Sequence, residues 1–188
     1  MSEVIATPSP SVTKASRADN SPILCVRNVE KVFGGRQNLM YALAGVSFDV
    51  ARGEFVAIMG PSGSGKTTML NCISTIDRPS AGRILINGSD ITTMSKNKLS
   101  AFRRDELGFI FQDSNLLDTL TGMENIALAL TIKGARPASI TSRIEDIART
   151  LNVTESLKQY PSQMSGGQKQ RVAAARAIVA DPSLILAD

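Results

Sequence analysis

The chain has 188 residues, of which 43% are hydrophobic and 20% are charged, so it fits one globular domain with a small subdomain and excludes a fibrous or wholly disordered polypeptide. The net charge of +4 is too small to indicate a surface that coats nucleic acid, and we expect no nucleic-acid partner. The chain holds no histidine, which excludes histidine-based metal sites and catalytic triads, and its two cysteines, Cys25 and Cys72, predict buried thiols in a reducing compartment.

The N-terminal segment and the apolar runs provide no targeting signal. Residues 1–22 are rich in Ser, Thr and Pro and contain no continuous apolar stretch, so they predict a disordered tail and not a signal peptide. Every apolar run is shorter than the roughly 18 to 20 residues that a membrane span requires. We therefore expect a folded domain over residues 23–188 with no span of its own.

Strands are predicted along the first half of the chain. Ile23–Val29 and Val46–Val50 are β-prone, and Arg52-Gly53 predicts a tight turn before a strand at Glu54–Met59. The apolar run from Phe55 to Met59 is typical of a strand that is buried on both faces of a parallel sheet. This pattern predicts an α/β fold with a mostly parallel core sheet.

An antiparallel patch is predicted beside this core. Gly82–Ile86 and Ser89–Ile91 flank Asn87-Gly88, a pair that readily adopts the positive φ angles of a type I′ turn. This sequence predicts a hairpin.

Helices are predicted for most of the second half. They cover Ser95–Arg104, Thr121–Leu130 with Thr121 and Glu124 as a capping box, and Ser165–Val179. A further helix is predicted around residues 140–151 and is amphipathic. Its apolar stripe is formed by Ile140, Ile144, Ile147, Ala148 and Leu151. Short strands are predicted at Leu107–Phe111 and, buried, at Leu184–Ala187.

A phosphate-binding loop is the strongest motif in the sequence. Residues 60–67 read Gly-Pro-Ser-Gly-Ser-Gly-Lys-Thr, which fits G-x-x-x-x-G-K-[ST] between a predicted strand and a predicted helix. The glycines let backbone N–H groups surround phosphate oxygens at the positive end of a helix. Lys66 should neutralise the β and γ phosphates, and the Thr67 hydroxyl is a suitable Mg²⁺ ligand. A chance glycine-rich turn is the less favoured alternative.

A second helix begins with a similar anion-binding pattern. Ser165-Gly166-Gly167-Gln168 combines a Ser-x-x-Gln capping box with two glycines that expose backbone amides. Taken alone, this tetrapeptide fits an ordinary capped helix better than a ligand site, because capping boxes are common.

Together these motifs resemble, in order and spacing, the ATP-binding subunit of ABC transporters. The resemblance covers almost everything from Ile23 onward, and Met164 departs from the usual Leu of the family with little expected consequence. It implies a P-loop NTPase core, a helical subdomain at about residues 113–164, and binding of ATP and Mg²⁺. The matching segments are Gly60–Thr68, Phe109–Gln112, Met164–Arg171 and Leu184–Asp188.

The resemblance also implies roles for single residues. Phe33 looks like the aromatic that stacks on adenine, with Tyr41 as the fallback and a core phenylalanine as the alternative. Gln112 is similar to the glutamine that contacts Mg²⁺ and the attacking water, and Asp188, expected to be buried, matches the acid that holds Mg²⁺ through water. The implied nucleotide contacts are Phe33, Gly60, Pro61, Ser62, Gly63, Ser64, Gly65, Lys66, Thr67, Thr68, Ser165, Gly166, Gly167 and Gln168; the implied metal contacts are Thr67, Gln112 and Asp188.

Two partners follow from the resemblance. Ser165–Gln168 would cap the γ-phosphate held by a second subunit, which implies a head-to-tail homodimer. Helices between Asp113 and Ser162 would contact an integral-membrane permease driven by ATP hydrolysis, placing the chain at the cytoplasmic face of the cell membrane. Within the family, Phe109–Thr121 and Tyr160–Arg171 look most like the bacitracin-resistance branch, near macrolide-efflux and lipoprotein-release ATPases, which favours antimicrobial-peptide export.

The resemblance also raises an expectation about the C-terminal end. In the family, a catalytic glutamate follows the position of Asp188 and a switch histidine lies further on, so we expect a C-terminally truncated copy without turnover. A non-catalytic nucleotide-binding module is the alternative. A DNA-repair or translation ATPase is disfavoured, because Gln112–Ser165 has no room for a coiled-coil insertion or a zinc module.

Overall fold

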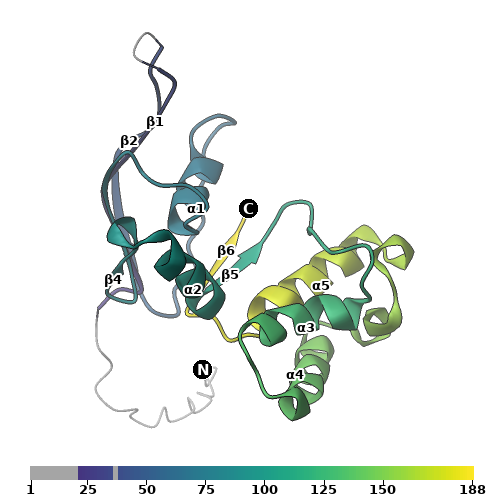
Figure 1. Cartoon of the computed structure of the whole chain (residues 1–188). Helices are drawn as coiled ribbons and strands as arrows, with labels where there is room; N and C mark the ends of the chain where they lie inside the picture. Colours follow the sequence, from purple (N-terminus) through teal and green to yellow (C-terminus); the bar gives the residue numbers. More distant parts are fainter. Residues whose placement is uncertain (1–20, 36–37) are drawn as a thin grey trace, which may run out of the picture.

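The computed structural model describes residues 21–35 and 38–188. The predicted N-terminal tail therefore lies outside the described residues, apart from Ser21 and Pro22. The α/β class is confirmed: two sheets and five α-helices alternate along the described chain (Figure 1).

A four-stranded antiparallel sheet forms one side of the molecule. Its strand order is β2-β1-β3-β4, with the bounds Leu24–Phe33 for β1, Met40–Val50 for β2, Ala81–Ile86 for β3 and Ser89–Asp90 for β4. Leu24 pairs with both Val50 and Ile86, so β1 is central. The predicted hairpin is confirmed, and Asn87 and Gly88 at its turn have φ angles of 50° and 75°.

A parallel pair of strands forms the second sheet. β5 (Leu107–Ile110) pairs with β6 (Leu184–Ala187) in a register that joins Leu107 to Leu184 and Ile110 to Ala187. Both strands were predicted. Leu186 is buried, but Ile185 is 43% exposed, so the prediction that β6 is buried holds for only part of the strand.

Helix α1 (Lys66–Ile73) lies between the two sheets (Figure 1). Its Met69, Cys72 and Ile73 are buried in one cluster with residues from β1, β2 and β3 on one side and with Leu186 of β6 on the other. Helix α2 (Lys96–Glu106) adds Leu99. We call this the sheet cluster; its buried members are Ile23, Leu24, Val26, Val29, Leu43, Val50, Met69, Cys72, Ile73, Ile84, Ile86, Ile91, Leu99 and Leu186.

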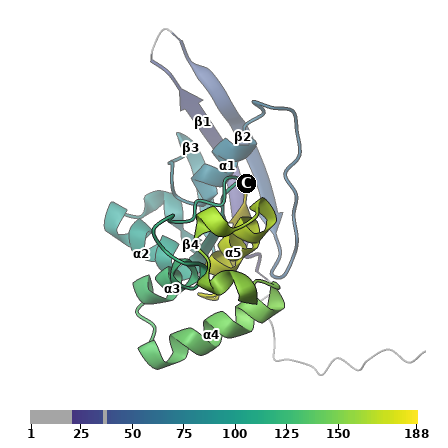
Figure 2. The same cartoon turned by 90° about the vertical axis from the view of Figure 1, so that its right-hand side faces the viewer.

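The three remaining α-helices pack around a separate core. They are α3 (Gly122–Ile132), α4 (Pro137–Thr150) and α5 (Gly166–Ile178), joined by short 3-10 helices at Thr154–Lys158 and Pro161–Gln163. A further 3-10 helix, Ile91–Thr93, follows β4. Figure 2 shows α3, α4 and α5 gathered in the lower half of the view. We call their core the helix cluster; its buried members are Ile126, Leu130, Ile144, Ala148, Val153, Leu157, Met164, Val172, Ala175 and Val179.

Two predictions about burial were wrong. Residues 54–59 form no strand, and Phe55 and Met59 are 95% and 88% exposed. A strand requires a neighbour for its backbone groups, and none of the described strands pairs with this segment, so its apolar side chains have no sheet to pack in. Cys25 is only partly buried, whereas Cys72 is fully buried, and burial raises the pKa of the Cys72 thiol to about 11.

Within the described part of the chain, no helix is long and apolar enough to cross a membrane.

Candidate functional site

The loop before α1 has the backbone geometry of an anion cradle. Helix α1 begins at Lys66, as predicted, and Gly65 and Gly63 adopt left-handed φ angles of 90° and 80°. A Cβ atom on Gly65 would lie 2.4 Å from the Ala42 carbonyl oxygen, so packing against β2 also requires glycine there. The motif glycines therefore have a structural reason that is independent of any ligand.

Lys66 bends back over this loop. Its Nζ donates hydrogen bonds to the carbonyl oxygens of Gly60 at 2.9 Å and Pro61 at 2.8 Å. The loop is accessible to solvent: Gly60, Pro61, Ser62, Gly63, Ser64 and Thr67 are exposed, while Gly65, Lys66 and Thr68 are partly buried. An ammonium group therefore lies beside open backbone amides at the positive end of α1, an arrangement that suits a phosphate chain.

Thr67 and Asp188 meet beside this loop. The Thr67 hydroxyl donates to the Asp188 Oδ1 at 3.1 Å, across 121 positions of sequence. Asp188 follows the last residue of β6, and its backbone N–H donates to the Ile110 carbonyl of β5 at 3.1 Å. The Asp188 side chain is exposed, so the expectation of a buried carboxylate was wrong. Asp188 directly follows β6 and lies at the solvent-exposed end of the two-stranded sheet.

Gln112 approaches the same edge from β5. Ile110 pairs with Ala187, so Gln112 and Asp188 both follow the carboxyl ends of neighbouring parallel strands. Ligands commonly bind at this edge of α/β sheets. Gln112 is exposed.

The oxygen atoms gathered here fit Mg²⁺ better than a softer metal. Thr67 and Asp188 offer a hydroxyl and a carboxylate, and the described residues contain no cluster of three or more His, Cys, Asp or Glu that could form a complete metal cage. Mg²⁺ is typically held by one or two protein oxygens together with water and substrate phosphates. The donor set is therefore compatible with Mg²⁺ bound alongside a nucleotide.

Phe33 and Tyr41 lie on the exposed end of the β1–β2 hairpin. Phe33 pairs with Met40 and Val32 pairs with Tyr41, and the two aromatic residues are 38% and 61% exposed. The alternative that Phe33 belongs to the core is therefore wrong. Lys31 Nζ lies 4.9 Å from the centroid of the Phe33 ring. Stacking on adenine stays a prediction for both rings.

The N-terminus of α5 has the predicted capping box. Ser165 Oγ accepts the backbone N–H of Gln168 at 3.3 Å, and Gln168 Oε1 accepts the backbone N–H of Ser165 at 2.8 Å. Gly166 and Gly167 are exposed. A Cβ on Gly166 would meet nothing within 4 Å, and one on Gly167 would meet only Arg171 Nη1, at 3.9 Å.

These two helix termini are not brought together within one chain. Helix α5 lies with α3 and α4, whereas α1 lies between the sheets (Figure 1). Across residues 21–35 and 38–188, no hydrogen bond joins the phosphate loop to Ser165–Gln168.

The structure adds contacts that the sequence analysis missed. Gln170 of α5 donates from Nε2 to the backbone carbonyl of Gln112 at 2.6 Å, and Arg176 of the same helix donates to the carbonyls of Ser114 and Asn115. These residues lie 58 or more positions from their partners, and the acceptors are backbone oxygens. Since a backbone carbonyl has no side-chain signature, no sequence pattern indicates such pairs.

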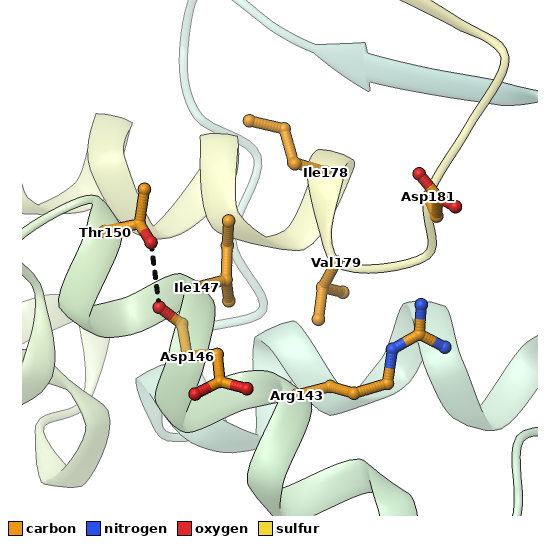
Figure 3. A pocket seen from close by; sticks show the side chains of 7 residues that line it. All are labelled: Arg143, Asp146, Ile147, Thr150, Ile178, Val179 and Asp181. Carbon is orange, nitrogen blue, oxygen red and sulfur yellow. Dashed lines mark hydrogen bonds between the residues drawn. The ribbon is translucent and has the colours of Figure 1, made fainter. Parts of the chain in front are cut away.

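An open pocket lies elsewhere, between α4 and the C-terminal end of α5. Its volume is about 300 Å³, and Thr150 Oγ1 donates to the Asp146 carbonyl at its edge (Figure 3). None of the predicted site residues lines it. The lining residues are Arg143, Asp146, Ile147, Thr150, Ile178, Val179 and Asp181.

Comparison with known proteins gives a consistent result. The family model for ABC transporters matches residues 43–188. The chain is 50% identical to the ABC transporter ATP-binding protein YxdL of Bacillus subtilis (strain 168) and 47% identical to the bacitracin export ATP-binding protein BceA of Halalkalibacterium halodurans. Each alignment covers 88% of this chain, which spans 64% and 66% of those relatives, respectively.

A solved structure also resembles this chain. It is a dimeric ATP-binding cassette in a post-hydrolysis state, bound to ADP and Pi. The TM-score is 0.81 at 38% identity, over 88% of this chain and 73% of the other.

Proposed function

The chain belongs to the ABC transporter family, and we propose that it binds ATP with Mg²⁺ and supplies energy to a membrane transporter. The meeting of the phosphate loop, Thr67 and Asp188 at one edge of the molecule is the observation that supports this proposal. It combines a phosphate cradle with oxygen ligands for a hard cation.

Each residue of this site has a defined task in the proposal. The loop amides and Lys66 hold and neutralise the phosphates, while Phe33, or Tyr41 in its place, stacks on adenine. Thr67, Asp188 and Gln112 hold Mg²⁺, which stabilises charge on the phosphates when bound. Gln112 also orients the attacking water.

We propose that hydrolysis occurs in a head-to-tail dimer. Gly166 and Gly167 expose backbone amides on a part of the molecule that is separate from the phosphate loop. A second copy would bring its Ser165–Gln168 terminus to the γ-phosphate held by the first. The dimer reported for the similar ATP-binding cassette supports the association of two copies.

The proposed partner is an integral-membrane permease at the cytoplasmic face of the cell membrane. Family membership supports this partner, and the contact surface that we propose is the outer face of the predicted helical subdomain, over about residues 113–164. The substrate class that we propose is a peptide antibiotic, supported by 47% identity to a bacitracin export ATP-binding protein. Expression with the cognate permease should raise the bacitracin concentration that a sensitive host survives, and an unchanged value would contradict this substrate.

Nucleotide binding is the direct test of the site. In the complete gene product that contains this sequence, Lys66→Ala should weaken ATP binding by about a hundredfold, because a charge contact to the phosphates is removed. Lys98→Ala is the matched control, since Lys98 is an exposed lysine on α2 outside the proposed site. Calorimetric titration with MgATP measures the affinity of both variants. Equal affinity of Lys66→Ala and wild type would overturn the assignment.

A further inference from the structure

Lys31, on β1, lies close to the Phe33 ring and is held there by residues from another part of the chain. Its Nζ donates to Asp77 Oδ1 at 2.7 Å and to the Arg78 carbonyl at 2.8 Å, 46 and 47 positions further along the sequence. The same Nζ lies over the Phe33 ring, 4.9 Å from its centroid. The position of this cation is therefore set by two oxygen acceptors and not by the ring alone.

The ion pair between Lys31 and Asp77 is sheltered on the lysine side. The Lys31 side chain is 12% exposed, and that of Asp77 is 37% exposed. A charged group that loses most of its hydration needs a partner, and an ammonium group over an aromatic face is attracted more strongly when water is excluded. Asp77 and Phe33 together replace the water that Lys31 has lost, so the three side chains depend on one another.

The Phe33 ring has room for a ligand beside this cation. A planar ring has two faces, and Lys31 lies over one of them. Phe33 is nevertheless 38% exposed, so solvent reaches the ring from another direction. Because a base cannot stack where the ammonium group already lies, the geometry directs a stacked base to the opposite face of the ring.

The backbone at the end of β1 is held by the residues that precede β3. Strand β3 begins at Ala81, which pairs with Glu30, so the last residues of β1 have no β3 residue opposite them. Ser80 takes over this role: its N–H donates to the Glu30 carbonyl at 2.7 Å, and its Oγ accepts the Val32 N–H at 3.0 Å. Residues 77–80, which we call the support segment, therefore hold the end of β1.

The support segment is also attached to α1, the helix that begins in the phosphate loop. The Asp77 N–H donates to the carbonyl of Asn71 in α1 at 3.0 Å, and Asp77 Oδ1 accepts the Arg78 N–H at 2.7 Å as well as Lys31. Arg78 Nη2 donates to the Met94 carbonyl at 2.6 Å. Asp77 thus connects the strand that carries the proposed adenine contact with the helix that carries the proposed phosphate contact.

We propose that Lys31 and Asp77 are positioning residues that fix the Phe33 ring relative to the phosphate loop, so that the ring is placed for adenine before the nucleotide binds. The proposal rests on the proposed function, because stacking of Phe33 on adenine belongs to it. It adds that an ion pair outside the nucleotide contacts preorganises the ring. Preorganisation raises affinity, because less conformational freedom is lost on binding.

NMR of the free protein tests the position of the cation without any nucleotide. Ring currents shift the signals of protons that lie over an aromatic face, so the ε-methylene protons of Lys31 should resonate upfield of those of Lys98, an exposed lysine on α2. Asp77→Ala removes the carboxylate acceptor and should return the Lys31 signals most of the way to the ordinary lysine position. Ordinary Lys31 signals in the wild type, or signals that Asp77→Ala leaves in place, would overturn the proposal.

Two ligands separate the positioning of the ring from an effect on the phosphate loop. In the complete gene product that contains this sequence, Lys31→Met should weaken MgATP binding about fivefold, because the ring loses the cation that holds it. Binding of magnesium tripolyphosphate, which has no base, should stay at the wild-type value. Arg27→Met is the control: it breaks an ion pair with Asp49 at the other end of β1 and should leave both affinities unchanged.

Two further variants complete this experiment. Lys31→Arg keeps a cation and should recover most of the MgATP affinity, and in a Phe33→Leu background Lys31→Met should cause no additional loss. Equal losses for both ligands, no loss for either, or an additional loss in Phe33→Leu would overturn this proposal and leave the proposed function intact. A wild-type protein that binds neither ligand would overturn the proposed function and this proposal with it.

Discussion

The two glycine-containing helix termini, before α1 and before α5, differ in why they contain glycine. Gly65 has a left-handed φ of 90°, and a Cβ there would lie 2.4 Å from the Ala42 carbonyl oxygen. Gly166 has no positive φ, and a Cβ there would meet nothing within 4 Å. The fold of this chain therefore requires one glycine and not the other.

This difference indicates what each terminus is for. The loop before α1 has a shape that depends on its own packing against β2, so a single copy forms this loop without a partner. At the terminus of α5, neither the backbone conformation nor the packing of Gly166 requires a glycine. A glycine at this position suits close approach by a group from outside the chain. We therefore expect a substitution at Gly65 to lower the stability of the fold, and a substitution at Gly166 to lower activity while the stability is unchanged.

Gly65→Ala should have the largest effect. The substitution introduces a backbone clash and a strained φ, so the free energy of unfolding should fall by roughly 2 to 4 kcal/mol and nucleotide binding should be lost. Chemical denaturation and MgATP titration measure the two effects. A variant with wild-type stability would contradict the packing argument at Ala42.

Gly166→Ala should affect activity and not stability. At the first position of α5 an alanine fits sterically, so the free energy of unfolding should change by no more than about 0.5 kcal/mol. ATP affinity of the isolated copy should also stay unchanged. ATPase activity should fall by about a hundredfold, because the added methyl group separates the α5 amides from the γ-phosphate. Full activity would remove the reason for placing this terminus in the site.

The smallest effect concerns the capping boxes of the helix cluster. The box of α3 uses Glu124, whereas that of α5 uses the neutral Gln168. Hydrogen bonds from the Thr121 backbone N–H and hydroxyl hold the pKa of Glu124 below its ordinary value of 4.5. A carboxyl group with a lowered pKa stabilises the fold above its unfolded pKa and loses that contribution as pH falls through the folded value.

Glu124→Gln should therefore remove a small acid-sensitive part of the stability. Denaturation curves of wild type and variant should differ slightly at neutral pH, and the difference should vanish below the folded pKa of Glu124. Gln168→Glu is the converse variant, which should introduce such a dependence at α5. A constant difference across the acid range would show that the carboxylate does not act through its charge.

The sequence predicted the elements whose signals are local. The Asn87-Gly88 hairpin, the start of α1 at Lys66 and both capping boxes follow from residues within a few positions of one another. The prediction of a buried strand at Phe55–Met59 was wrong. Apolar side chains indicate that a segment can be buried, but a strand also needs a neighbouring strand to pair with. The exposure of Asp188 was missed for a related reason, since burial depends on neighbours that a motif does not specify.

Part of the candidate site could also be predicted from local sequence. The motif predicted the phosphate loop and Thr67, and the structure adds the contact between Thr67 and Asp188. The attachment of the Gln112 segment by Gln170 and Arg176 could not be predicted, because its acceptors are backbone carbonyls far away in sequence. Only the folded arrangement of α5 beside β5 reveals it.

Mixing two inactive variants tests the central claim most directly, namely that each ATP is held between the phosphate loop of one copy and the α5 terminus of another. A mixed dimer of Lys66→Ala and Gly166→Ala contains one site in which both defects meet and one site in which both elements are intact. If half of the dimers are mixed, the ATPase rate should recover to about a quarter of the wild-type rate. A mixture no more active than the two separate variants would show that each copy works alone.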